Sequence, residues 1–178
     1  VSLENLEKAR FEKGSMSAKA LSYTVRNTRK MIPFDEIIPK ALHEIAEGFL
    51  NPPMKCFGYS GIQKLGKEML TWLECTPNPK TDLADQADMM ENAGTGGAIF
   101  RNFFRDYLYE CMDYFPGSVS LGTGAELYKK AAANWSEIAR LIKKAGDSLE
   151  FGYLEKASEI CLETALIEKE AMQKLIRI

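Results

Sequence analysis

The chain has 178 residues, of which 46% are apolar and 27% charged, so it can bury one sizeable core. A formal net charge of -2 carries no basic excess, and we therefore expect no binding to nucleic acid. No apolar run approaches the roughly 20 residues that span a bilayer, and no signal region is present, so the sequence predicts a cytoplasmic protein with no membrane partner.

Residues 1–30 differ in pattern from the rest of the chain. Ser2 is expected to cap a short helix that continues to Lys13 and stops at Gly14. Apolar and polar residues alternate from Leu21 to Arg26, which is typical of an extended segment or an edge strand. Since no second strand is predicted, a pairing partner would lie outside this chain or in another copy of it.

Helical periodicity begins at Asp35 and continues to the end of the chain. Residues 31–178 are therefore predicted to form an all-α bundle of about six helices. Asp35 is expected to cap the first of these helices, Pro39 is tolerated in its first turn, and Asn51 ends it. Its predicted inward stripe is Ile38, Leu42, Ile45 and Phe49.

Two further helices are expected before residue 93. One starts at Ser60 and turns Ile62, Leu65, Met69 and Trp72 or Leu73 inward, and the other is a weakly patterned acidic helix from Thr81 to Asn92. The strongest helical pattern follows the glycines. Its wide apolar face predicts the central helix of the bundle and comprises Phe100, Phe103, Phe104, Tyr107, Leu108, Cys111 and Phe115.

The last two helices are predicted from caps and apolar spacing. Thr123 and Glu126 are predicted to form a capping box, and Gly146 is predicted to end the helix that follows. The final helix starts near Leu149. The inward positions of the two helices are Leu127, Ala131, Trp135, Ile138 and Ile142, then Leu154, Ala157, Ile160, Cys161, Ala165, Ile167 or Glu168, Met172 and Leu175.

The segment Gly94-Thr95-Gly96-Gly97 raises the question of a phosphate loop. A Walker loop needs Lys and Ser or Thr after its last glycine, and a dinucleotide fingerprint needs glycine at position 99, which is Ile. Neither pattern is present. Two interpretations remain: an anion site at the start of a helix, assisted by Arg101, or a tight turn between two packed helices.

Arg101 and Arg105 lie four residues apart and could clamp one carboxylate together. Alternatively they pair with Asp106 or Glu110 or stack on Tyr109. The candidate contacts for a ligand or another domain are Gly94, Thr95, Gly96, Gly97, Arg101 and Arg105.

No metal, cofactor or catalytic residue is assigned. His43 is the only histidine, so neither a zinc-protease pair nor a di-iron bundle can form, and the cysteines include no CxxC pair. Cys111 and Cys161 fall in apolar helical patterns and are interpreted as buried thiols. Several carboxylates are interpreted as solvated helix faces: Glu44, Glu47, Glu163, Glu168 and Glu170.

Four segments, taken in order, resemble the C-terminal helical region of the butirosin-biosynthesis protein H-like family: ALHEIAEGFLNPP, GYSGIQKLGKEMLTW, GTGGAIFRNFFRDYL and LYKKAAANWSEIARLI. The resemblance covers about residues 33–178. In that family a papain-like cysteine domain precedes such a region, and the name-giving member is similar to an acyltransferase that moves an aminoacyl group from a carrier-protein thioester to an aminoglycoside amine. The family's Cys and His belong to the preceding domain, so no catalytic residue is carried over.

The resemblance implies that residues 1–30 are the tail of, or a linker from, a missing N-terminal cysteine domain. Residues 31–178 would then be a non-catalytic accessory domain of a cysteine acyltransferase-like or peptidase-like protein, which covers or completes the active site or mediates dimerisation. The full-length protein would act on a small-molecule or carrier-protein substrate. The residues alone leave an alternative open: a stand-alone helical module that binds a protein partner or a small anion.

Overall fold

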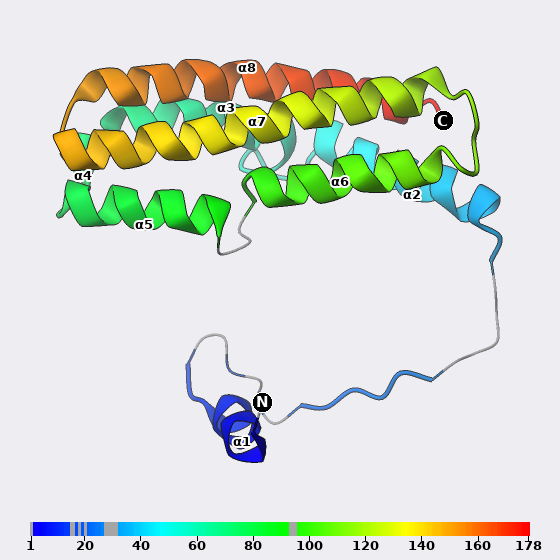
Figure 1. The fold of residues 1–178 in the computed structure, drawn as a ribbon, viewed down its shortest axis with the longest axis horizontal. Helices are drawn as coiled ribbons and strands as arrows, with labels where there is room; N and C mark the ends of the chain where they lie inside the picture. Colours follow the sequence, from blue (N-terminus) through cyan, green and yellow to red (C-terminus); the bar gives the residue numbers. More distant parts are fainter. Residues whose placement is uncertain (1, 15–16, 18, 20, 27–31, 93–95) are drawn as a thin grey trace. The chain divides into compact units, whose positions relative to one another are not determined.

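The computed structural model describes residues 2–14, 17, 19, 21–26, 32–92 and 96–178. The chain divides into two compact units, Val1–Ile32 and Pro33–Ile178. The second unit is an all-α bundle, as the sequence predicts (Figure 1). Among the described residues no helix is both long and apolar enough to cross a membrane.

The first unit contains the helix α1, Leu3–Phe11. The Ser2 hydroxyl accepts a hydrogen bond from the Asn5 backbone amide at 3.2 Å, which confirms the predicted cap. No residue of α1 is buried. Residues 21–26 form neither helix nor strand and are all exposed, so the predicted edge strand has no partner among the described residues.

The second unit begins with α2, Phe34–Leu50. Its N-cap is Pro33, so the prediction that Asp35 caps the helix is wrong, and Asp35 lies in the first turn, where its charge favours the helix start. The prediction for Ile45 is also wrong, because Ile45 is 43% exposed while Ala46 is fully buried. The buried positions keep a spacing of four residues, which turns one row of side chains toward α8.

The predicted single helix from Ser60 is three consecutive elements: α3, Gly58–Glu68; a 3₁₀ turn, Met69–Thr71; and α4, Trp72–Cys75. It starts two residues earlier than expected because the chain turns at Gly58, where φ is 58° and an added Cβ would lie 2.1 Å from the Phe49 carbonyl oxygen. The Thr71 hydroxyl donates to the Glu68 carbonyl at 2.9 Å, where the helical bonding pattern tightens.

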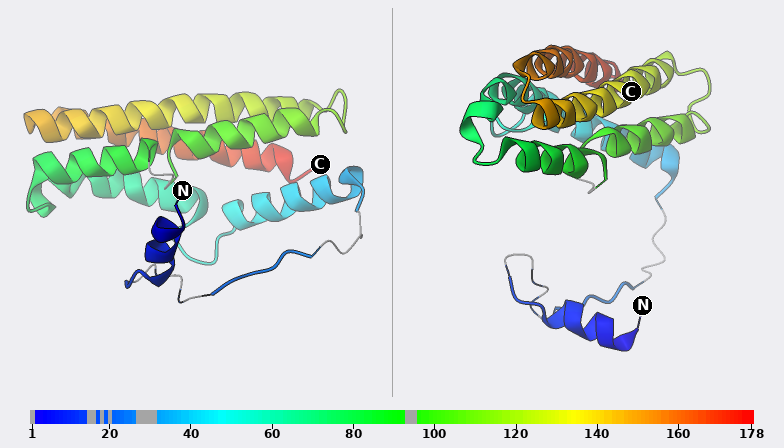
Figure 2. Two further views of the ribbon diagram at one scale, coloured as in Figure 1. Left: turned by 60° about the horizontal axis from the view of Figure 1, so that its bottom comes forward. Right: turned by 60° about the vertical axis from the view of Figure 1, so that its left-hand side comes forward.

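Helices α5, Pro79–Glu91, and α6, Ala98–Cys111, follow one another along one side of α7 (Figures 1 and 2). The prediction that α6 is the central helix is wrong. Leu108 and Cys111 are buried against α7, but Phe100 is 48% exposed and Phe103 is 60% exposed. Because α6 lies at the side of the bundle, only part of its wide apolar face is covered.

The centre of the unit is the antiparallel pair α7, Val119–Ser148, and α8, Phe151–Leu175. Their apolar faces form most of two buried clusters. Helix α8 also contacts α3 and α2, whereas α7 contacts α5 and α6. The two long helices therefore fix the positions of α2, α3, α5 and α6.

Both predicted boundaries of α7 are wrong. The helix starts after Ser118, whose hydroxyl accepts from the Leu121 amide at 3.4 Å, so Thr123 and Glu126 lie inside it. Gly146 does not end it either, since the helix continues to a left-handed residue at Leu149. Gly146 is buried, and an added Cβ there would lie 3.0 Å from the Leu83 Cβ, so the lack of a side chain lets α5 approach closely.

Candidate functional site

A buried ion pair joins the start of α6 to the middle of α8. Arg101 donates from Nε to Glu168 Oε1 at 2.9 Å and from Nη2 to Oε2 at 3.1 Å. The Glu168 side chain is 1% exposed and that of Arg101 is 15% exposed. The interpretation of Glu168 as a solvated carboxylate is therefore wrong, because its position on α8 faces the core and its charge is matched by Arg101.

Trp135 of α7 completes this cluster. Its indole Nε1 donates to Glu168 Oε1 at 2.7 Å, and the Arg101 Cζ lies 4.6 Å from the centroid of its ring. The guanidinium is thus held both by a carboxylate and by the face of an aromatic ring. We call Arg101, Trp135 and Glu168 the buried triad; it links three helices and carries no net charge.

Several titratable groups in the core of the helical unit have raised pKa values. Burial, and then the charge of Glu168, raises the pKa of the Cys161 thiol to about 12. Burial likewise raises the pKa of Tyr128 well above its usual value, and that of the Cys111 thiol. A nucleophilic cysteine needs the opposite shift, so these buried thiols are poor candidates for catalysis.

The glycine segment is only partly described, since Gly94 and Thr95 lie outside the described residues. The Gly96 carbonyl accepts a hydrogen bond from Arg101 Nη1. At Gly97 an added Cβ would lie 1.9 Å from the Met90 carbonyl oxygen, so the end of α5 and the start of α6 meet here without room for a side chain. The described part of the segment is a close turn whose nearby guanidinium is engaged within the protein.

Arg105 does not share a ligand with Arg101 among the described residues. It pairs with Asp106 at 2.8 Å and donates to the Asn102 side chain at 2.5 Å. The sequence predicted Asp106, Glu110 or Tyr109 as alternative partners, and the structure shows the pair with Asp106. The six predicted contact residues therefore do not form one site: Arg101 lies with Gly96, and Arg105 pairs separately.

An apolar depression lies where three parts of the unit meet: α2, α8, and the segment that precedes α3. A groove of about 450 Å³ is lined by Ile45, Phe49, Pro53, Phe57 and Met172. A second pocket of about 430 Å³ shares Phe49 and Phe57 with it and extends to Arg101 and Trp135. Around these hollows Met54 is 54% exposed and Phe57 is 51% exposed. We call this surface the α2–α3 face.

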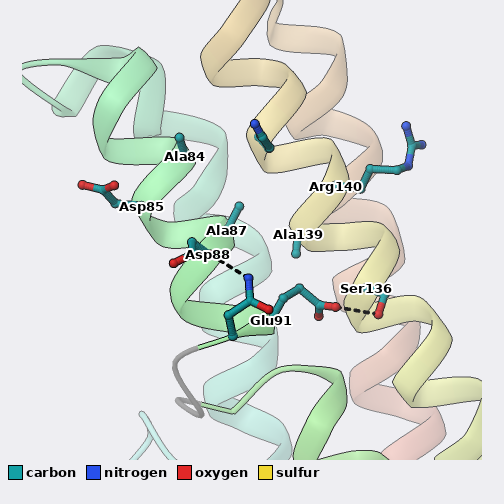
Figure 3. Close-up of a pocket in the computed structure, with 10 residues that line it drawn as sticks. Ala84, Asp85, Ala87, Asp88, Glu91, Ser136, Ala139 and Arg140 are labelled. Atoms are coloured by element: carbon teal, nitrogen blue, oxygen red, sulfur yellow. Dashed lines mark hydrogen bonds between the residues drawn. The ribbon is translucent and has the colours of Figure 1, made fainter.

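A pocket of about 550 Å³ lies between α5 and α7, and we call it the α5–α7 groove (Figure 3). Its floor consists of Ala84, Ala87 and Ala139. Its polar lining residues are Asp85, Asp88, Glu91, Asn92, Ser136, Arg140 and Lys143. The sequence does not predict this groove, because alanines on two separate helices carry no signal of a shared floor.

The remaining reactive side chains are dispersed. His43 is exposed, with Nδ1 3.4 Å from the Ile176 carbonyl oxygen, and Cys56 and Cys75 are exposed free thiols. Among the described residues no three His, Cys, Asp or Glu side chains are placed to hold a metal ion.

The model of one protein family matches nearly the whole chain. The model of a domain of unknown function, DUF4872, matches residues 4–175. No curated protein and no solved structure matched the chain. Because the match extends from α1 through α8, the chain belongs to the DUF4872 family.

Proposed function

We propose that the helical unit is a non-catalytic accessory domain of a cysteine acyltransferase-like or peptidase-like protein, of the kind found in the butirosin-biosynthesis protein H-like family. In this proposal the α2–α3 face docks against the domain that carries the nucleophile. The observation that carries the proposal is the apolar character of that face, combined with the resemblance of the sequence segments.

Several properties of the α2–α3 face suit a domain interface. Phe57 and Met54 place large apolar side chains at the surface beside two connected hollows. Phe and Met side chains are enriched in the cores of protein interfaces relative to the rest of the surface. Phe57 directly precedes the tight turn at Gly58, which fixes the backbone beside it.

The two buried thiols of the helical unit are poorly suited to catalysis. Both have raised pKa values, and a cysteine that attacks an acyl group needs a lowered one. In this proposal the preceding domain supplies the nucleophile.

The test compares the isolated chain with a version extended upstream in its gene. With an acyl-thioester donor and an amine acceptor, the isolated chain should give no transfer, and the extended protein should be active. Transfer by the isolated chain contradicts the proposal, as does an upstream extension that lacks a papain-like Cys and His.

The docking face is tested with a matched pair of substitutions in the extended protein. Phe57→Asp should reduce transfer about tenfold or more, because it places a charge in the interface. Phe103→Asp changes an aromatic that is at least as exposed and lines neither hollow, and it should leave transfer within about twofold. Equal effects of the two would remove the α2–α3 face from the proposal.

A second candidate function, self-association, uses the same α2–α3 face, since an exposed apolar face can also bind a second copy of the chain. Sedimentation of the isolated chain distinguishes the two. A concentration-dependent dimer that Phe57→Asp dissociates, and Phe103→Asp does not, would favour self-association.

A further inference from the structure

The second hollow on the α2–α3 face combines apolar walls with one charged group. We call it the Arg101 pocket; its volume of about 430 Å³ is within the usual range for sites that bind small molecules. Arg101 is the one charged residue among the described residues that line it. The apolar side chains of its walls are Phe49, Phe57, Ile62, Leu65 and Trp135.

Arg101 keeps hydrogen-bond donors that the protein does not use. A guanidinium carries five N–H groups. Two of them bind the Glu168 carboxylate and one binds the Gly96 carbonyl. The other two, one on each terminal nitrogen, have no hydrogen-bond partner among the described residues. Arginine binds carboxylates through such pairs of N–H groups, so these donors can accommodate a second carboxylate.

Glu168 orients Arg101 without lining the pocket. Its side chain is buried and is not among the residues of the pocket wall, whereas Arg101 and Trp135 are. The carboxylate of Glu168 and the ring of Trp135 hold the guanidinium in place before any ligand enters. A group inside the pocket therefore meets the cation before the carboxylate that balances it. Because the guanidinium is mostly buried, its attraction for an anion is stronger than in bulk water.

From this geometry we infer that the Arg101 pocket binds a small monocarboxylate with an alkyl body. The carboxylate accepts hydrogen bonds from the two remaining N–H groups of Arg101, and the alkyl chain packs against the apolar walls. All of these groups belong to the helical unit, so the inference goes beyond the proposed function and does not rest on it. Its test uses the isolated chain and leaves Phe57 unchanged, so its failure is separate from a failure of the proposed docking.

The experiment uses two exposed thiols of the unmodified chain as reporters. Cys56 lines the Arg101 pocket, whereas Cys75 lies outside it. Sodium hexanoate at constant ionic strength should slow the alkylation of Cys56 by iodoacetamide in a saturable manner and leave Cys75 unaffected, as measured by peptide mass spectrometry. Hexan-1-ol has the same alkyl chain without the charge, and half-protection of Cys56 should need a concentration about tenfold higher or more.

A matched pair of variants tests the role of charge. Cys56→Glu places a carboxylate in the pocket, and it should weaken hexanoate binding about tenfold or more, because it competes for Arg101 and repels the ligand. Cys75→Glu makes the same change in net charge at an exposed position outside the pocket, and binding should stay within about twofold. The indole N–H resonance of Trp135 reports binding in both variants.

Three results would overturn the inference. Equal protection of Cys56 and Cys75, or none, shows that hexanoate does not occupy the pocket. Equal affinity for hexan-1-ol shows a merely apolar hollow. Equal weakening by the two variants shows a general effect of net charge. The protection experiment needs no substitution, so its outcome does not depend on the folding of a variant.

Discussion

Glu168 is a charged residue within an apolar stripe of α8, next to residues that are fully buried. Its carboxylate receives two hydrogen bonds from Arg101 and one from Trp135. Taking both charges out of water is costly, and the pair repays that cost only while both partners are present. The buried triad is therefore sensitive to the loss of either charged partner.

We expect Glu168→Gln to lower the free energy of unfolding by about 3–5 kcal/mol, because it leaves the Arg101 charge buried without a counterion. Urea unfolding measures the change. Glu163→Gln is the control: its carboxylate pairs with Lys130 at 2.8 Å but is 54% exposed, so its loss should cost less than about 1 kcal/mol. Similar costs for the two variants would show that the buried pair contributes no more than a surface pair.

The sequence could not identify the partner of Glu168. Helical spacing placed either Ile167 or Glu168 inward, and both are buried. Arg101 lies 67 residues earlier, and nothing in the local pattern of either residue indicates a contact over that distance. The same limit explains why Arg101 was predicted to bind a ligand or a neighbour on its own helix.

At the scale of elements, the turn between α5 and α6 depends on the absence of a side chain at Gly97. Its φ is -79°, which other residues also adopt, so the requirement comes from space. We expect Gly97→Ala to destabilise the unit by about 1–3 kcal/mol, since the Met90 carbonyl must move.

Gly122 is the matched control for this substitution, because an added Cβ there meets nothing closer than 4.0 Å and the residue lies inside α7. Gly122→Ala should leave stability unchanged or raise it by about 0.5–1 kcal/mol. Thermal unfolding followed by circular dichroism distinguishes the two variants. A neutral Gly97→Ala would show that the turn relaxes at little cost.

Helix existence was predictable from periodicity, but helix position and several boundaries were not. The aromatic residues of α6 predicted a central helix, yet α7 occupies the centre with smaller side chains such as Ala131 and Ala145. Side-chain size indicates how much surface a helix can bury, while small residues allow helices to approach closely. Thr123 and Glu126 match the sequence pattern of a helix cap, but they lie inside α7, because that helix begins directly after Ser118.

At the scale of the whole molecule, four thiols and phenols that are buried or half-buried in the helical unit share one direction of pKa shift. Burial raises the pKa values of Cys111, Cys161, Tyr107 and Tyr128. The folded chain therefore retains protons that the unfolded chain releases. Stability from these groups is fully present below their unfolded pKa values and is lost as pH rises toward the folded ones.

For Cys161 this window extends from 9.0 to about 12. Within it we expect the free energy of unfolding to fall by about 1.4 kcal/mol per pH unit from this thiol alone. Urea unfolding of the full chain between pH 8 and about 10.5 measures the slope. Cys161→Ala should be less stable at pH 8 but show a shallower slope, whereas Cys56→Ser, at an exposed thiol, should keep the slope unchanged. An equal slope in Cys161→Ala contradicts the assignment.

Helix α8 contacts α7, α3 and α2, and it follows all of them in the chain. During synthesis the apolar faces of α2 and α3 therefore leave the ribosome before the helix that covers them exists. The nascent chain must keep these faces from aggregating until Leu175 has emerged, a situation in which chaperones bind exposed apolar segments. Rare codons or a stall within α8 should consequently lower the yield of folded protein more than the same delay placed before α2.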